Sequence, residues 1–523
     1  MAAWLLLAVA FAYAQSPAVS GKVMTKDGAP IPGASIHIQG HSTGIVADAN
    51  GAFKIDAKNG DLLLITAIGF TTVTIKASST APLMISMTEN SKEINEVVVT
   101  ALGIKRDKRM LTYSVQEVKG ATLTEAKQDN VVNALAGKVA GVQINNSSGI
   151  PGSSARIVIR GNTSLVGNNQ ALFVVDGIPM DNNEAGNPNR PEYSGGTANR
   201  ASDIDPNIIE SITVLKGAAA TALYGSAAAR GAVIITTKNG SGTGSKGAPN
   251  VSVSSSYSFQ TPILPELQNK FAQGTGGVYV DGNNGGISSS SWGPLMDTLK
   301  VNGVPVQKHN PAKEFFKTGH TSDNNINVGG YSDKSNYLIS YSYLKTTGTI
   351  PNTDYSRHSL FTRYGVKLLN NLQLTTQFNY IQSNNHRYLE GNNFVNPLWT
   401  VYGAPISWDP HPSVNEDGSQ RLFRAARNNP YWILDNTGMQ DKNNRIIPVV
   451  TIAYNPLPWL TITERAGADM YVNATDYHEA PGAIGWGNTG PTPVIGQMYQ
   501  RDIKYQQFNN DVMVEAKIGR AHV

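Results

Sequence analysis

The sequence predicts a mainly β protein that is exported from the cytoplasm, and three observations support this fold class. Charged residues make up only 15% of the 523-residue chain, against roughly 25% in an average soluble protein. Glycine is abundant, with 51 residues. Short apolar runs that alternate with polar residues, separated by turn residues, recur along most of the chain. The length suggests three or four domains.

Composition and motifs argue against several classes of function. The net charge of +4 gives no electrostatic footprint for nucleic acid. The chain has no cysteine, which excludes disulfide scaffolds, cysteine nucleophiles and thiolate metal sites. Residues 240–247 lack the ending of a phosphate loop, and His478-Glu479 lacks the second histidine of a zinc protease. We therefore expect no enzyme, no cofactor and no metal site.

The N-terminus is typical of an exported protein. Residues 4–11 form an apolar run too short to span a bilayer as a helix, and Ala12-Tyr13-Ala14 is a small-residue cleavage pattern. Residues 1–14 are thus predicted to be a signal peptide. No later stretch approaches the roughly 20 apolar residues of a membrane helix. The mature protein is then either soluble outside the cytoplasm or crosses a membrane as β-strands.

Residues 18–88 predict a small antiparallel β-sandwich. Ile36 and Ile38 alternate with polar neighbours, as in a half-buried strand. Asp27-Gly28 and Asn50-Gly51 lie between apolar runs, where we expect primed hairpin turns.

The segment 93–101 contains a strand with no obvious partner nearby. Its core is Glu96, Val97, Val98, Val99 and Thr100, followed by a basic stretch. Such a strand can add to the edge of another protein's sheet through main-chain hydrogen bonds. The alternative is an ordinary edge strand of the preceding sandwich.

Residues 104–240 predict a mixed α/β unit. Val131, Leu135 and Val139 repeat every four residues and indicate a helix that ends at Gly141. Asp205-Pro206 predicts a capped helical turn. Strands are expected over residues 142–144, 156–160, 172–177, 212–215 and 233–236.

Residues 250–517 show the alternation of long antiparallel strands with one apolar and one polar face. Tyr337, Ile339, Tyr341 and Tyr343 share one face, whereas Leu338, Ser340 and Ser342 share the other. The same alternation runs from Leu372 to Tyr380, and a hairpin is expected over residues 451–464. Residues 274–291 and 384–399 read as long loops. A soluble sandwich or propeller is the alternative on this pattern alone.

Several pieces of sequence resemble known families. Residues 18–88 resemble a carboxypeptidase-regulatory-like domain through Pro30-Ile31-Pro32-Gly33-Ala34 and residues 48–53. Residues 104–240 resemble the plug of the starch-utilisation-type (SusC/RagA-like) TonB-linked outer-membrane transporters of Bacteroidetes. That resemblance rests on the pieces LAGKVAGVQI (residues 135–144), RIVIRG (156–161), LFVVDGIP (172–179) and residues 210–240.

The resemblance implies that residues 250–517 are the first part of a transmembrane antiparallel β-barrel of about 22 strands. Those 268 residues are too few for that number, so we expect a fragment. The last six residues, 518–523, resemble neither a strand end nor an aromatic terminus. They match the translation of a sequencing adapter, and we expect them to be non-native.

The resemblance also implies a function and partners. Glu96 to Thr100 would be the TonB box, through which TonB with ExbB/ExbD powers import of oligosaccharides, or alternatively peptides. A SusD-like lipoprotein lid would be the outer partner, the N-terminal domains would lie in the periplasm, and outer-membrane lipid would surround the barrel. Arg160 and Arg230 would pair the plug with barrel carboxylates. A TonB-linked signal transducer and a non-transporting surface adhesin are the alternative functions.

Overall fold

The computed structural model describes most of the chain and divides it into two compact units, residues 1–96 and 97–523. The residues described are 18–39, 44–89, 97–99, 105–107, 115–125, 127–128, 130–146, 148–162, 164–165, 169–183, 198–241, 246–284, 286–391, 393–425, 427–487 and 490–517. The predicted signal peptide and the six C-terminal residues lie outside them. Among the described residues, no helix is long and apolar enough to cross a membrane.

The first unit is a β-sandwich whose two sheets enclose one apolar core. One sheet has the order β4-β1-β7, with β1 (Ala18–Thr25), β4 (Ala52–Asp56) and β7 (Leu83–Met87). The other has the order β3-β2-β5-β6, with β2 (Ser35–Ile38), β3 (Gly44–Val46), β5 (Leu62–Thr66) and β6 (Val73–Lys76). The expectation of a wholly antiparallel sandwich was wrong, because β1 and β7 pair in parallel. The chain enters β7 from the opposite sheet, so no hairpin dictates its direction.

The two predicted hairpin turns have a different geometry. Gly28 and Gly51 have φ of +87° and +73°, but Asp27 and Asn50 are not among the residues with positive φ. Gly28 donates to the carbonyl of Thr25, and Gly51 to that of Asp48. Each loop is therefore a type I turn followed by a glycine bulge, which also suits strand twist.

The second unit begins with a short hairpin and an α/β unit. In the hairpin, β8 (Val97–Val99) pairs with β9 (Lys105–Asp107). The α/β unit holds a five-stranded sheet of order β10-β15-β16-β13-β14 and the hairpin β11-β12. The strands are β10 (Val115–Lys119), β11 (Val142–Asn146), β12 (Ala155–Ile159), β13 (Leu172–Val175), β14 (Ile178–Met180), β15 (Ile209–Leu215) and β16 (Ala232–Thr237). The helices are α1 (Gly120–Glu125), α2 (Val131–Ala134), α3 (Ala218–Tyr224) and the 3-10 turns η4 (Arg200–Asp203), η5 (Pro206–Ile208) and η6 (Gly225–Ala228).

The predicted helix over Val131, Leu135 and Val139 is only one turn long. All three side chains are buried as expected. The helix α2 nevertheless ends at Ala134, and Gly137 has φ of +72°, which no helical residue adopts. The apolar spacing therefore predicted burial correctly and helix length incorrectly.

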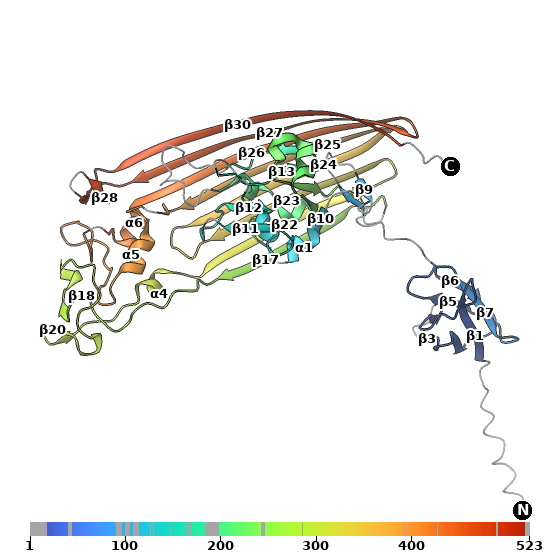
Figure 1. The fold of residues 1–523 in the computed structure, drawn as a ribbon, viewed down its shortest axis with the longest axis horizontal. Coiled ribbons are helices and arrows are strands. Elements are labelled where there is room, and N and C mark those ends of the chain that lie inside the picture. The colour runs from blue at the N-terminus through green and yellow to red at the C-terminus, as the bar shows by residue number, and fades with distance from the viewer. Residues whose placement is uncertain are drawn as a thin grey trace, which may run out of the picture. The chain divides into compact units, whose positions relative to one another are not determined.

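Most of the rest of the unit is one sheet of eight long antiparallel strands, shown in Figure 1. In sheet order these are β17 (Asn250–Gln260), β22 (Gly319–Tyr331), β23 (Ser335–Thr347), β24 (Asp354–Leu369), β25 (Leu372–Arg387), β26 (Thr437–Leu457), β27 (Leu460–Glu479) and β30 (Gln497–Ala516). The hairpin expected over residues 451–464 is the β26–β27 turn. Residues 384–387 belong to β25 rather than to a loop. The two edge strands, β17 and β30, do not pair with each other in the described chain.

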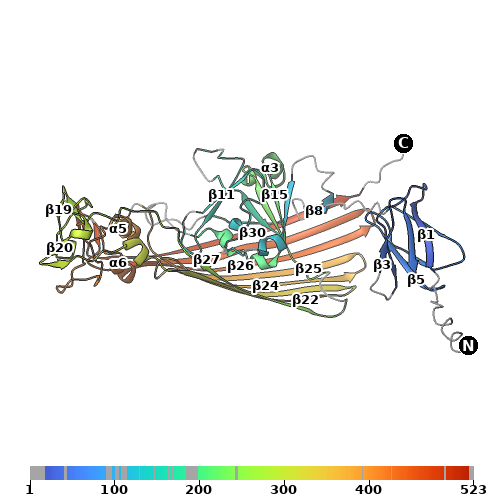
Figure 2. The ribbon, with the colours of Figure 1, turned by 90° about the horizontal axis from the view of Figure 1, so that it is seen from below.

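One end of this sheet has tight turns and the other has long connections. We call them the turn end and the loop end. The loop end, where α5 and α6 gather in Figures 1 and 2, contains small elements. They are α4 (Pro311–Phe315), α5 (Pro397–Gly403), α6 (Pro430–Asn436), β18 (Gly274–Thr275), β19 (Val278–Tyr279), β20 (Lys300–Val301), β21 (Val304–Pro305), β28 (Ile484–Gly487), β29 (Gly490–Pro493), η7 (Gly282–Asn284) and η8 (Met296–Thr298).

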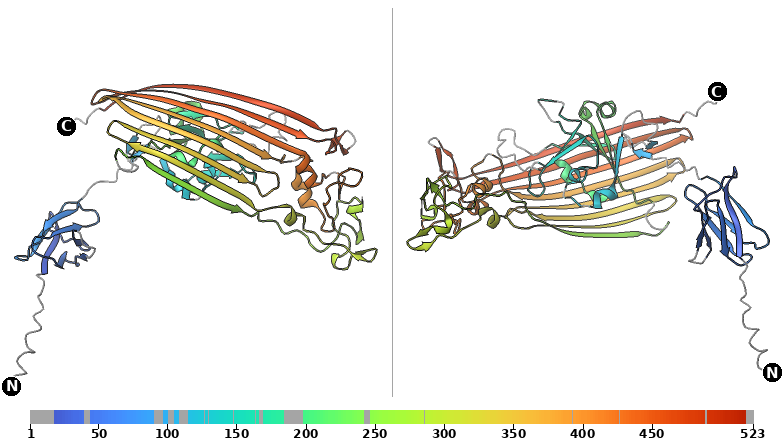
Figure 3. Two further views of the ribbon diagram at one scale, coloured as in Figure 1. Left: turned by 180° about the vertical axis from the view of Figure 1, so that it is seen from behind. Right: turned by 60° about the horizontal axis from the view of Figure 1, so that its bottom comes forward.

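The α/β unit lies against one face of the long sheet, as Figures 2 and 3 show. On β23 the face toward the α/β unit holds Leu338, Ser340 and Ser342, all buried. The opposite face exposes apolar side chains, such as Ile339 and Tyr341 on the same strand. The predicted alternation is confirmed, and the apolar face is the outer one.

Candidate functional site: the contact between the α/β unit and the long sheet

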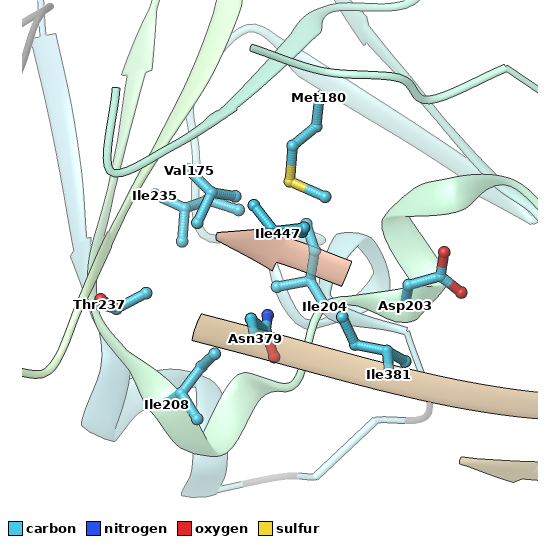
Figure 4. Close-up of a pocket in the computed structure, with 10 residues that line it drawn as sticks. All are labelled: Val175, Met180, Asp203, Ile204, Ile208, Ile235, Thr237, Asn379, Ile381 and Ile447. Atoms are coloured by element: carbon cyan, nitrogen blue, oxygen red, sulfur yellow. The ribbon is translucent and has the colours of Figure 1, made fainter. Parts of the chain in front are cut away.

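An apolar layer joins the α/β unit to the sheet. One core cluster combines residues of the α/β unit with side chains of four sheet strands, namely Leu338, Phe361, Ile381, Ile447 and Val449. A cavity of about 10 Å³ remains between them, close to the least space that holds one water. Figure 4 shows Met180 and Ile447 approaching each other in its lining. The two parts are therefore packed like a single protein interior.

Arg445 of β26 is the centre of a buried ionic cluster across this contact. Its Nε and Nη2 each donate to a carboxylate oxygen of Asp469 at 2.7 Å. Its Nη1 donates to Asp203 of the α/β unit at 3.1 Å. Asp469 in turn accepts the main-chain N–H of Asp181, whose carboxylate accepts the Tyr471 hydroxyl at 2.6 Å. We call these five residues the Arg445 cluster.

A second buried cluster forms around Asp205. Its carboxylate accepts the N–H of Asn207, which is the predicted cap at Pro206. The same carboxylate also lies 3.9 Å from Arg357 of β24 and accepts the hydroxyl of Ser342. Arg357 donates from Nη1 to the carbonyl of Ser202 at 2.6 Å. Asp205 therefore caps the turn at Pro206 and also binds the sheet.

Further ion pairs surround these clusters. Arg363 of β24 lies 3.6 Å from Asp176, and it donates to Thr237 at 2.9 Å. Lys127 pairs with Asp323 of β22 at 2.9 Å. In the ion pairs of Asp176, Asp203 and Asp205, the α/β unit supplies the carboxylate and the sheet supplies the guanidinium.

Burial determines what these pairs can do. Arg445, Arg357, Asp203 and Asp205 are each no more than 2% exposed. Removing one partner of a buried pair leaves an uncompensated charge, which typically costs about 3–5 kcal/mol. The ion pairs therefore specify one docked position of the α/β unit. Lys238 adds a smaller effect: burial lowers the pKa of its ammonium, which donates to the carbonyl of Asn207.

The two arginines expected to join the α/β unit to sheet carboxylates are placed differently. Arg160 is exposed and has φ of +59°, and Arg230 is half-buried with no hydrogen bond at Nε. Within the described ranges neither forms an ion pair with a carboxylate of the sheet. Their pairing remains a prediction.

The strand β8 has a local partner that the sequence reading did not identify. Val97, Val98 and Val99 are in register with Asp107, Arg106 and Lys105. Glu96 and Thr100, the ends of the predicted energy-coupling segment, lie outside the described residues. The hairpin shows that these valines adopt the extended backbone that strand addition requires.

Family models match the sandwich and the α/β unit. Residues 19–99 match the family described as CarboxypepD_reg-like domain. Residues 107–232 match the TonB-dependent Receptor Plug Domain.

Two curated proteins are similar over most of the chain. TonB-dependent receptor SusC of Bacteroides thetaiotaomicron is 28% identical over 89% of this chain and 43% of its own length. TonB-dependent receptor P26 of Formosa agariphila is 26% identical over 96% of this chain and 48% of its own length. This chain therefore spans less than half of each relative.

Solved structures share the fold. A RagAB peptide importer in an open-open state has a TM-score of 0.57 and 21% identity, over 79% of this chain and 46% of that one. The closed-closed state has a TM-score of 0.56 and 20% identity, over the same shares.

Proposed function

Because the chain is a homologue of the TonB-dependent receptor SusC and carries the receptor plug domain, we propose that it is part of a TonB-dependent outer-membrane transporter. The α/β unit is then the plug, and the long sheet is part of the barrel wall. TonB-dependent receptors are transporters rather than enzymes, which agrees with the motif analysis.

One observation carries this proposal: the sheet is apolar on its outer face and is covered by the plug on its inner face. On β25 the outer side chains Leu372, Leu374, Phe378 and Tyr380 span about nine residues, the length of a membrane-crossing strand. Beyond them the same face turns polar at Gln382. A soluble adhesin would have no reason to expose this band.

We expect the barrel to be closed, because unpaired sheet edges are costly in a membrane. The edges β17 and β30 present unpaired backbone groups, each costing several kcal/mol in hydrocarbon. The relatives are longer than this chain. We infer that the additional length supplies strands that pair with these edges.

In this proposal TonB pairs with residues 96–100 and pulls on the plug. A pull on residues 96–100 reaches the plug first at β10, which pairs with β15. The segment 198–208 is held to the sheet by Arg445 and Arg357. The plug therefore has one part near the pulled end and another part fixed to the wall by buried charges.

The solute and outer partner are inferred from the relatives. The structural neighbours are named as a RagAB peptide importer, and the sequence motifs of this chain resemble transporters of the starch-utilisation type. We propose import of oligosaccharides or peptides, with a lipoprotein lid of the SusD/RagB kind at the loop end. Export by a signal peptide and periplasmic N-terminal domains are part of the same proposal.

Heat modifiability of the full-length receptor tests the barrel. A closed barrel resists detergent without boiling, so the unheated protein should migrate faster on a gel than the boiled protein. Equal migration before and after boiling would argue against a closed barrel. A receptor unfolded by urea before loading is the control and should migrate like the boiled sample.

A further inference from the structure

A tight turn in the plug forms a rigid wedge. Ser153 donates its N–H to the carbonyl of Ile150 at 3.2 Å, and Pro151 and Gly152 lie between them. Gly152 has φ of +70°, so the four residues form a type II turn with proline and glycine at the positions that this turn favours. Ser148 braces the turn by accepting the N–H of Ile150 at 2.9 Å. We call residues 148–153 the wedge loop.

The wedge loop is pressed against the barrel wall at the loop end. A Cβ atom on Gly152 would clash with the ring of Tyr355, which is itself buried. A Cβ on Gly348, in the connection between β23 and β24, would lie 3.1 Å from Pro151. The loop therefore lies in close contact with the wall, with no space for a side chain at Gly152.

Above the wedge loop three short helices share one construction. Helices α4, α5 and α6 each begin at an Asn-Pro pair, with the asparagine side chain accepting a main-chain N–H at the cap. The capping asparagines are Asn310, Asn396 and Asn429. Proline at the first helical position and asparagine at the cap stabilise such short helices.

Ile150 of the wedge loop completes the apolar core between these helices. Its side chain is 5% exposed, and it belongs to one cluster with residues from all three helices. The other buried members are Ala312, Phe315, Ile350, Tyr388, Val401 and Leu434. Among the members of this cluster, Ile150 is the one from the plug. We call this group the three-helix cluster.

Polar contacts reinforce the same link. The carboxylate of Glu390 accepts the Tyr388 hydroxyl at 3.2 Å and interacts electrostatically with Ser148 at the base of the wedge loop. Asn352, in the β23–β24 connection, donates to the carbonyl of Leu434 in α6 at 3.1 Å. The wedge loop is thus attached to the loop end by an apolar tip and a polar base.

We propose that the wedge loop is the linkage through which the three-helix cluster sets the position of the plug. Close-packed cores respond to displacement by switching between discrete arrangements rather than by deforming smoothly. A solute or partner protein that moves the helices must therefore either carry Ile150 along or open a cavity around it. The packing itself does not depend on the proposed transport function. Only the identity of the solute or partner protein that moves the helices rests on the proposed function.

Hydrogen exchange in the purified full-length receptor tests this linkage. The variants are Phe315→Ala in the three-helix cluster, Ile150→Ala in the wedge loop, and both together. Exchange is followed by mass spectrometry in the plug strands β10 and β12. We expect Phe315→Ala to speed exchange in these strands about tenfold, equivalent to about 1.4 kcal/mol. In the Ile150→Ala background, Phe315→Ala should cause no further change, because the linkage is already broken.

Leu165→Ala is the matched control. Leu165 is a fully exposed side chain on another plug loop, and its loss should leave exchange in β10 and β12 unchanged. If Phe315→Ala prevents folding, Leu398→Ala replaces it, because Leu398 is only partly buried in the cluster.

Two results would overturn the proposal: unchanged plug exchange when the helices loosen, or additive effects of the two substitutions. The measurement uses neither TonB nor a solute. A receptor that failed every transport assay could therefore still support the linkage, and a transporting receptor could still refute it.

Discussion

Arg445 shows how much of the docking of the plug depends on single side chains. Its guanidinium contacts Asp203, the carbonyls of Arg200 and Asp181, and Asp469 of the neighbouring strand. The sequence offered no signal for this cluster, because its members are separated by up to about 290 residues. Asp203 and Asp205 could be noticed beside Pro206, but the arginines opposite them could not.

Replacing Arg445 by methionine should destabilise the full-length receptor by about 3–5 kcal/mol, because Asp203 and Asp469 lose their buried counter-charge. The midpoint of urea unfolding, followed by near-ultraviolet circular dichroism, measures this. Lys246→Met is the control: its pair with Asp333 is exposed, so the midpoint should not change. Equal midpoints for both variants would show that the Arg445 cluster does not hold the plug.

Glu390 should make the contact between wedge loop and loop end depend on pH. Burial raises its pKa above the ordinary 4.5, and hydrogen bonds from Ser148 and Tyr388 and the charge of Arg387 only partly oppose this. A raised folded-state pKa means that the stabilising contribution is present below the ordinary pKa and is lost as pH rises through the folded value. Glu390→Gln should therefore match the wild type near about pH 4 and be more stable near about pH 7. Thermal unfolding at both values measures the difference, and a constant offset between the two proteins would contradict the assignment.

At the scale of elements, strands were predictable and connections were not. A period of two assigns every side chain of β23 or β25 to one face, so Ile339 and Phe378 could be placed on the apolar face from sequence. The length of the helix at Val131 could not be predicted, because the apolar spacing does not reveal that Gly137 has a positive φ. The three-helix cluster could not be predicted because it forms only when segments near residues 150, 313, 400 and 433 meet.

The apolar band predicts how outward substitutions on β25 behave. Phe378→Arg places a charge in the middle of the band and should cost about 2–4 kcal/mol, whereas Gln382→Arg, beyond the band on the same face, should cost about 0–1. The yield of heat-modifiable full-length receptor in the outer membrane measures both. Similar yields would mean that this face does not contact lipid.

The chain as a whole combines a regulatory-like sandwich, a plug domain and one sheet of eight long strands. The composition that first indicated an exported β protein is explained by the long strands, the polar inner face and the glycine-rich connections. The plug domain could be recognised from motifs because its pieces keep their order along the chain, and residues 107–232 match that domain. The solute could not, because neither the plug motifs nor the strand pattern encodes it.

The proposed function requires energy coupling through β8, and deletion of Glu96–Thr100 from the full-length receptor tests this requirement. Solute uptake and solute binding at the cell surface are measured on the same cells, with Val98→Thr as a control that keeps a β-branched strand. We expect the deletion to abolish uptake and leave surface binding intact, while Val98→Thr retains both. Uptake by the deletion variant at the wild-type rate would contradict it.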